Sequence, residues 1–170
     1  MPTATPAELP VRTATAAELD AVTLYDLLRL RVDVSVVEQD CAYPELDGRD
    51  LEPSTLHCWI ADDDGAVLGY LRVLREPGGG TRIGRVVTAR SARGGGVAAR
   101  LLLHGLQLAA PPVRIHAQAH LAEWYARFGF SVSGRAFVED GIAHVPMALP
   151  TELPASPACL PSSAAAAASA

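Results

Sequence analysis

Lysine is missing from this chain of 170 residues, and all 14 of its basic side chains are arginines. The chain therefore has no Gly-Lys-Ser/Thr sequence, which excludes a Walker-type phosphate loop. Only three cysteines are present, and the spacing of Cys41, Cys58 and Cys159 fits neither an even set of disulfides nor a metal-ligand motif. The five histidines form no metal-ligand spacing either. We therefore expect a reduced, cytoplasmic protein without a bound metal.

Long apolar runs are also absent, as is a basic, apolar leader at the N-terminus, so neither a membrane span nor secretion is expected. A net charge of −5 argues against nucleic-acid binding. The charge is unevenly spread. The stretch from Pro77 to Ala122 has six arginines and no acid, whereas the stretch from Glu38 to Asp64 has nine acids and Arg49 alone. This asymmetry predicts one surface suited to a polyanion and another suited to a cation.

The length allows one domain with a sizeable core. We expect a flexible N-terminus over residues 1–13 and a single domain over residues 14–149. From residue 150 to residue 170 the chain is rich in Pro, Ser and Ala. Such a composition buries too little surface to offset its ordering entropy, so a disordered tail is predicted.

Hydrophobic patterning predicts an α+β domain. The capping-box spacing of Thr15 and Glu18 predicts the start of an amphipathic helix that ends near Arg31, followed by a second helical turn and an acidic loop. Further helices are expected after residue 96 and over residues 121–128. Strands are predicted at residues 57–61, 67–74, 82–88, 113–118, 130–137 and 142–149. A mostly antiparallel sheet with helices on both faces fits this order.

A glycine-rich turn follows the third predicted strand. Gly94, Gly95 and Gly96 are contiguous, and apolar residues then recur at helical spacing through Leu106. Backbone N–H groups at a helix N-terminus bind phosphate oxygens well, and glycine lets the backbone approach closely. The dinucleotide-binding fingerprint needs spaced glycines and a later acidic residue, neither of which is present. Taken alone, the turn is equally compatible with a connection that binds no ligand.

Two motifs in order resemble the GCN5-related N-acetyltransferase (GNAT) superfamily. Residues 93–98 resemble its pyrophosphate loop, and Gln118, Tyr125 and the pair Gly129-Phe130 resemble its later motif, in which Asn usually stands where this chain has Gln118. Residues 31–40, 116–120 and 139–144 are similar to the ElaA-like branch. The resemblance covers residues 24–149. Ser35 stands where we expect a large aromatic residue.

The resemblance implies a fold with splayed central strands and a site for acetyl-CoA. The strand at residues 86–88 would pair with the pantetheine amides, and the pyrophosphate would lie on the N–H groups of the glycine loop. Arg100, one turn into the helix, would be a weaker phosphate contact. The residues that the resemblance assigns to the cofactor are Val86, Val87, Thr88, Arg93, Gly94, Gly95, Gly96, Val97, Ala98 and Gln118.

Direct acetyl transfer requires a neutral amine and an acid that protonates the departing thiolate. By its position in the motif, Tyr125 is the predicted general acid; the alternative is a tyrosine that only packs against Phe128 and Phe130. Glu38 is the predicted base, because the apolar run before it would raise its pKa. The acidic residues Glu38, Glu45, Asp47 and Asp50 would attract a cationic acceptor, a primary amine of a small polyamine-like molecule or a peptide.

A competing hypothesis is a non-catalytic acyl-CoA sensor or interaction domain with the same fold, which the glycine loop fits equally well. Tyr125 favours the enzyme. A flavin or dinucleotide protein is a third interpretation, but it lacks the acidic ribose partner. Assembly into a homodimer is left open by the sequence.

Overall fold

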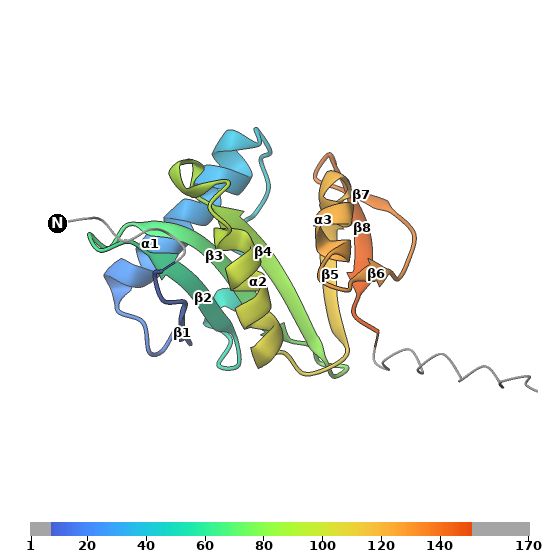
Figure 1. Ribbon diagram of the computed structural model, residues 1–170, viewed down its shortest axis with the longest axis horizontal. Helices are drawn as coiled ribbons and strands as arrows, with labels where there is room; N and C mark the ends of the chain where they lie inside the picture. The colour runs from blue at the N-terminus through green and yellow to red at the C-terminus, as the bar shows by residue number, and fades with distance from the viewer. Residues whose placement is uncertain (1–7, 151–170) are drawn as a thin grey trace, which may run out of the picture.

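The computed structural model describes residues 8–150, so the predictions for residues 1–7 and 151–170 lie outside the described residues. Eight strands form one sheet in the order β1-β2-β3-β4-β5-β8-β6, and β7 pairs with β8 beside β6 (Figure 1). The strands are β1 (Arg12–Ala14), β2 (Leu56–Ala61), β3 (Val67–Arg75), β4 (Thr81–Thr88), β5 (Val113–Gln118), β6 (Ser131–Val132), β7 (Phe137–Glu139) and β8 (Ile142–Ala148).

Helices cover both faces of the sheet. Helix α1 (Ala21–Val32) and the π-helical turn η1 (Asp33–Glu38) lie on one face, and α2 (Val97–Leu108) and α3 (Ala122–Ala126) lie on the other (Figure 1). Short 3₁₀ turns are η2 (Arg49–Leu51), η3 (Arg90–Ala92) and η4 (Ala119–Leu121). The predicted α+β class is confirmed. Among residues 8–150, no helix combines the length and apolar character that a bilayer span needs.

The central strands are buried on both faces because side chains alternate along a strand. Cys58 and Ile60 of β2 belong to the core beneath α2, whereas Trp59 and Ala61 belong to the core beneath α1, where Leu27 packs. A strand with a helix on each side must be apolar at successive positions. This explains why residues 57–61 show no polar alternation.

The sheet splits between β4 and β5. These two strands run parallel and are paired only at Thr81–Val113 and Arg82–Arg114, whereas the other neighbouring pairs are antiparallel. Beyond that short contact they diverge, and the gap widens toward the start of α2 (Figure 1). The splayed central strands expected from the sequence are therefore present.

The first helix begins later than predicted. Its N-cap is Asp20, whose side chain accepts a hydrogen bond from the N–H of Thr23 at 2.9 Å. Thr15 and Glu18 do bond as a capping pair, at 2.8 Å, but they close a separate turn. The folded domain also begins before residue 14, because β1 pairs with β2 and Leu9 is buried.

The final predicted hairpin is also more complex than a pair of strands. Its first strand, predicted at residues 130–137, divides into β6 and β7, which pair separately with β8. Ser131 lies opposite Ala148, and Phe137 lies opposite His144. The segment between β6 and β7 does not pair with β8. The prediction of one continuous strand over residues 130–137 was therefore wrong.

Ion pairs anchor the acidic loop that follows η1. Arg31, at the end of α1, is fully buried; its Nε lies 2.7 Å from Glu45 and its Nη1 lies 2.5 Å from Asp50. Arg72 of β3 contacts the same Asp50 at 2.9 Å and Asp47 at 2.6 Å. Each buried charge therefore has a partner of opposite sign, as burial requires. The loop is fixed to the sheet by arginines rather than by apolar side chains.

We predict that Arg31→Met lowers the free energy of unfolding by roughly 3–5 kcal/mol, because it removes the fully buried cation that Glu45 and Asp50 share. The matched control is Arg29→Met on the same helix. Arg29 pairs with Asp26 at the surface, where an ion pair contributes about 0–1 kcal/mol. Urea denaturation of both variants measures the difference. Equal midpoints would show that the buried network does not hold the loop.

Candidate functional site

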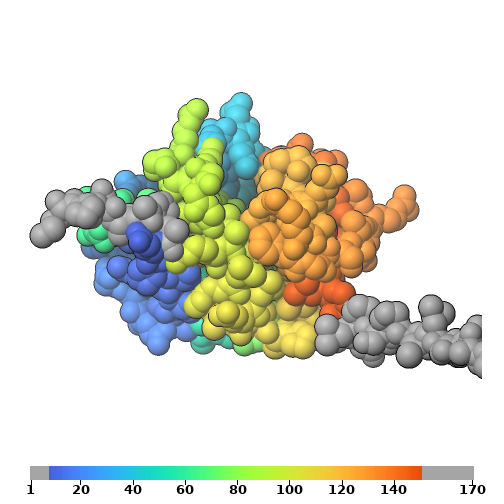
Figure 2. Space-filling model, viewed as in Figure 1, coloured from blue at the N-terminus to red at the C-terminus, as the bar shows by residue number. Residues whose placement is uncertain are grey.

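The gap between β4 and β5 opens into three cavities that share lining residues. One of about 800 Å³ lies beside the glycine loop, one of about 150 Å³ lies in the middle, and one of about 400 Å³ lies beyond it, beside the acidic loop. Gln39 and Gln118 line all three. Figure 2 shows the surface hollowed between the segment around η3 and α3. Because the cavities share lining residues, they adjoin one another; we call this row of cavities the passage and its two outer cavities the chambers.

The glycine loop lines the largest cavity. Gly94 and Gly96 have φ angles of 78° and 77°, and Gly96 is the N-cap of α2. A Cβ built on either residue meets nothing within 4 Å, so glycine is needed there for its backbone conformation and not to avoid a packing clash. The first N–H groups of α2 lack acceptors within the helix and lie at its positive end. These groups are suited to phosphate oxygens at this cavity.

Two predicted site residues, Arg93 and Glu38, contact each other across the loop. The guanidinium of Arg93 donates to both oxygens of Glu38, at 2.6 and 2.8 Å. This bond lowers the pKa of Glu38, so the expectation of a raised pKa was wrong. The apolar run before Glu38 leaves its carboxylate solvent-accessible, and the arginine dominates. Arg100 donates to the carbonyl of Leu9, so part of its guanidinium anchors the N-terminal segment.

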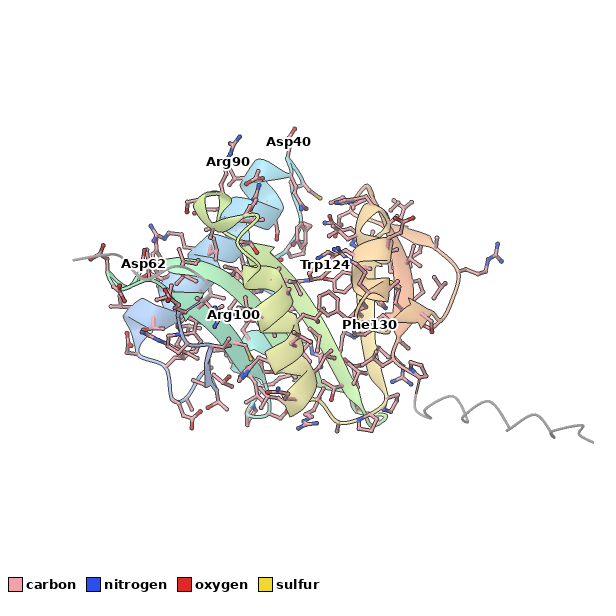
Figure 3. All side chains as sticks on the ribbon, viewed as in Figure 1. Asp40, Asp62, Arg90, Arg100, Trp124 and Phe130 are labelled. Atoms are coloured by element: carbon pink, nitrogen blue, oxygen red, sulfur yellow. The ribbon has the colours of Figure 1, made fainter. Side chains whose placement is uncertain are left out.

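Tyr125 lies where the passage meets the glycine-loop cavity, lining both the central cavity and the largest one. Its ring packs edge-on against Trp124 and Phe130, and burial raises the pKa of its hydroxyl to about 12. Trp124 lies on the side of α3 that faces α2 (Figure 3). The hydroxyl has no hydrogen-bond partner among residues 8–150. It is therefore a protonated donor at neutral pH, on a ring that packing holds in place.

The other predicted cofactor residues divide between cavity and core. Val86 and Thr88 line the largest cavity, whereas the side chain of Val87 is buried in the core beneath α1. Gln118, at the end of β5, donates to the side-chain oxygen of Gln39 at 3.0 Å. This bond spans the gap between β5 and the segment after η1. Tyr43 lies beside Ser35 in the central cavity, in the region where an aromatic residue was expected.

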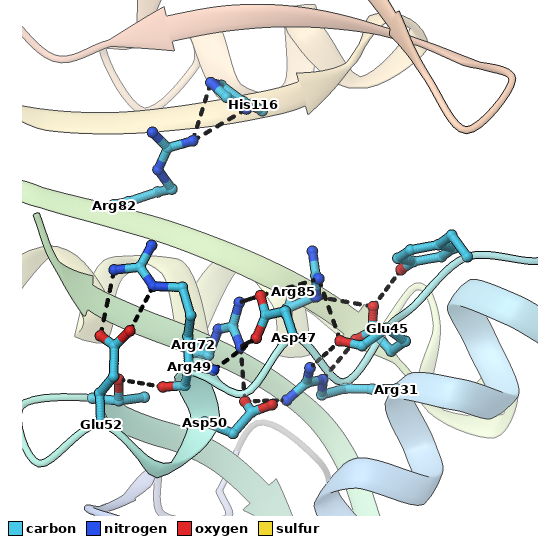
Figure 4. Close-up of polar contacts among 12 residues, drawn as sticks. Arg31, Glu45, Asp47, Arg49, Asp50, Glu52, Arg72, Arg82, Arg85 and His116 are labelled. Carbon is cyan, nitrogen blue, oxygen red and sulfur yellow. Dashed lines mark hydrogen bonds and ion pairs between the residues drawn. The ribbon is translucent and has the colours of Figure 1, made fainter.

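The acids that were expected to attract a cation are largely neutralised. Glu45 and Asp50 are buried at 3% and 5% exposure and are paired with arginines (Figure 4). Burial alone would raise the pKa of Asp47, but Arg72 outweighs it and lowers that pKa to about 2. Glu45 and Asp50 do not line the smaller cavity, and Asp47, which does line it, is paired with Arg72 at 2.6 Å. The expectation of a cation-binding surface at residues 45–50 was therefore wrong.

Histidines occupy two different environments near this chamber. His116 of β5 lies within 3.2 Å of Nη1 of Arg82 (Figure 4), and burial, reinforced by the charge of Arg82, lowers its pKa. The ring is therefore neutral at neutral pH. His57 is fully buried and bonded to Tyr70 and to the carbonyl of Asp50, which is a structural role. Among residues 8–150 no three His, Cys, Asp or Glu side chains are placed to share a metal ion.

Sequence reasoning missed the arginines of the smaller chamber. Arg49, Arg72, Arg82 and Arg85 all line it. The run of arginines without acids between residues 77 and 122 was a usable signal, but it was interpreted as a single surface for a polyanion. Two of its members, Arg82 and Arg85, face the opposite end of the passage.

Comparisons with known proteins agree with this geometry. The family described as the GNAT acetyltransferase domain matches residues 31–151. The ElaA protein of Escherichia coli is 38% identical over 78% of this chain and 90% of its own length. A UPF0039 protein of Mycobacterium bovis is 51% identical over 82% of this chain and 92% of its own length. The crystal structure of an acyl-CoA N-acyltransferase from Pseudomonas aeruginosa superposes with a TM-score of 0.78, at 39% identity, over 84% of this chain and all of that one.

We predict that Gly96→Val lowers the affinity for coenzyme A by more than tenfold, because the loop cannot keep its left-handed conformation beside the phosphates. Gly65→Val is the matched control. Its φ is 88°, its Cβ also meets nothing within 4 Å, and it lies in the turn between β2 and β3. Isothermal titration of coenzyme A into both folded variants measures the effect. Equal affinities would place the phosphates elsewhere.

Proposed function

The chain belongs to the GNAT acetyltransferase family, in its ElaA-like branch, and on that premise we propose that it transfers an acetyl group from acetyl-CoA directly to a primary amine. The family supports acyl-CoA-dependent acyl transfer in general; acetyl as the acyl group, and a small molecule or peptide as the acceptor, are our proposal. One observation carries it: three adjoining cavities with shared lining residues lead from the glycine loop, past Tyr125, to a second chamber.

In this proposal the phosphates of acetyl-CoA lie on the N–H groups from Gly94 to Ala98. Arg93 can contact them once it exchanges the carboxylate of Glu38 for phosphate, a comparable bidentate partner. The exposed backbone of Val86 and Thr88, on the unpaired edge of β4, offers hydrogen bonds to the pantetheine amides. The pantetheine arm of the cofactor would then direct the thioester toward the central cavity.

The chemistry follows from the groups at the passage. A neutral amine attacks the thioester carbonyl, the carbon–sulfur bond breaks, and the thiolate must gain a proton. The hydroxyl of Tyr125 is protonated, its ring lines two of the cavities, and it has no hydrogen-bond partner among residues 8–150, so it is suited to donate that proton. No covalent enzyme intermediate is needed, and neither buried thiol among residues 8–150 is assigned a role.

The amine must also lose a proton. Glu38 remains a predicted base, but the ion pair with Arg93 makes its carboxylate a weaker one. His116 is a second candidate, because its ring is neutral and lines both the central cavity and the smaller chamber. The two candidates lie at opposite ends of the passage, so separate variants distinguish them.

We predict that Tyr125→Phe lowers kcat by about 10²- to 10⁴-fold while coenzyme A affinity and the melting temperature stay near those of the wild type. The ring and its packing are kept, and only the proton donor is lost. Tyr25→Phe, at an exposed position of α1, is the control. Thiol release from acetyl-CoA with a panel of amines measures kcat. An unchanged kcat would mean that Tyr125 only packs against its neighbours. If the wild type released no thiol with any amine, the hypothesis of a non-catalytic acyl-CoA sensor would be favoured.

We predict that replacing the base removes the acidic limb of the pH profile of kcat/KM and lowers kcat/KM by about 10²-fold or more. Glu38→Gln and His116→Asn are compared over pH 5 to 9. If His116 is the base, wild-type activity falls as the pH drops through its lowered pKa, since only the neutral ring accepts a proton. A tighter affinity for coenzyme A with unchanged kcat in Glu38→Gln would limit Glu38 to its contact with Arg93.

A further inference from the structure

A bulge in β4 turns an extra arginine into the smaller chamber. Val73 pairs with Ile83 and Tyr70 pairs with Val87, so two residues of β3 lie opposite three residues of β4. The additional residue places Gly84 and Arg85 on the same face of the sheet. Arg85 accordingly has a left-handed φ of 53°, which is costly for a residue with a side chain. The strained backbone adds Arg85 to the face on which Arg82 already lies.

Both arginines keep part of their guanidinium available. Arg82 uses Nε for Glu76 and Nη1 for His116, and its Nη2 has no partner among residues 8–150. Arg85 uses Nε for Glu45 and Nη2 for Asp47 and the Glu45 carbonyl, which leaves its Nη1 without a partner in the same range. The two side chains are 32% and 26% exposed. The carboxylates hold these guanidinium groups in place without using all of their donors.

The opposite wall of the smaller chamber carries negative charge. Glu139 and Asp140, in the turn between β7 and β8, line the chamber and have no arginine partner among the described residues. The chamber therefore has guanidinium donors on its β4 side and free carboxylates at the β7–β8 turn. A polyamine would bring cationic groups against the arginines, which is unfavourable. A molecule with both an anionic group and an amine matches both walls.

We propose that the acceptor is an amino-acid-type molecule, whose carboxylate is held by Arg82 and Arg85 while its amine reaches the passage beside Tyr125. The inference rests on the proposed function, since it assigns the acceptor of that reaction. Two planar guanidinium groups recognise a carboxylate through paired N–H donors, a geometry that ammonium groups cannot supply. A chamber of about 400 Å³ is of the size that holds a small organic molecule.

The test compares acceptors that differ only in the anionic group: an amino acid, its carboxamide and its decarboxylated amine, with putrescine as the dicationic extreme. We expect kcat/KM for the amino acid to exceed that for its carboxamide by about tenfold or more, since hydrogen bonds to charged groups are the strong ones. Phosphoethanolamine against ethanolamine shows whether phosphate replaces carboxylate. Equal rates across the set, or a preference for putrescine, would overturn the proposal.

Arg82 also contacts His116, so Arg82→Met changes the rate with every acceptor to some extent. Beyond that shared change, it should raise KM for the amino acid about tenfold or more relative to KM for the decarboxylated amine. Arg29→Met, which removes the same charge from the outer side of α1, is the control. Coenzyme A affinity should not change, because the phosphates lie at the other end of the passage. An equal loss for all acceptors in Arg82→Met would contradict carboxylate recognition.

Acceptor binding can also be measured without catalysis, by calorimetric titration of the same molecules into the complex of the protein with coenzyme A. If no acceptor is turned over, the proposed transfer fails, but carboxylate-dependent binding that Arg82→Met abolishes still supports the chamber assignment. Binding of the carboxamide as tightly as the amino acid would refute that assignment, whatever the activity.

Discussion

The short contact between β4 and β5 is the constraint on which the site depends. Thr81 closes it: its N–H donates to the Pro112 carbonyl, and its hydroxyl donates to the Ala110 carbonyl and accepts from the Ala110 N–H. Gly80 has a φ of 86°, and a Cβ there would lie 2.4 Å from the Pro112 carbonyl. The two strands are thus tied firmly at one end, so they can separate at the other without the sheet coming apart. The passage, both chambers and the free edge of β4 all follow from that separation.

Opening a sheet exposes polar backbone and removes apolar contacts, so other interactions must hold the elements that flank the gap. On the α1 face this is done by Arg31 and Arg72, which share Asp50. Such a network costs desolvation and is weak evidence for net stability, but it fixes orientation because every partner is directional. An apolar loop could slide over the sheet. The ion pairs hold the loop in one position. Glu45, which Arg31 fixes, in turn pairs with Arg85 at 2.9 Å and so orients it.

Local patterns predicted much of this fold, and long-range partners explain the errors. The boundaries of β5 and the glycine loop followed from composition and turn chemistry, because those signals lie in adjacent residues. Thr15 and Glu18 were expected to start the first helix; they do form the hydrogen bond of a capping pair, but Asp20, five residues after Thr15, is the N-cap. The interpretation of the acids failed for a different reason. Their partners, Arg31 and Arg72, are 19 and 22 positions from Asp50, and only the fold brings them together.

Long-range structure also explains why the arginines of β4 were expected to share one polyanion-binding surface with Arg93. Arg82, Arg85 and Arg93 lie within twelve residues and read as one basic stretch. The bulge at Arg85 and the turn into the glycine loop send them to opposite ends of the passage. One arginine-rich segment thus provides positive charge to both chambers, which our proposals assign to the phosphates at one end and to an acceptor's carboxylate at the other. The central cavity lies between the two chambers and is lined by both Tyr125 and Arg85. In the proposed function it is where the thioester and the uncharged amine meet, so Arg85 would keep a cationic amine out of it.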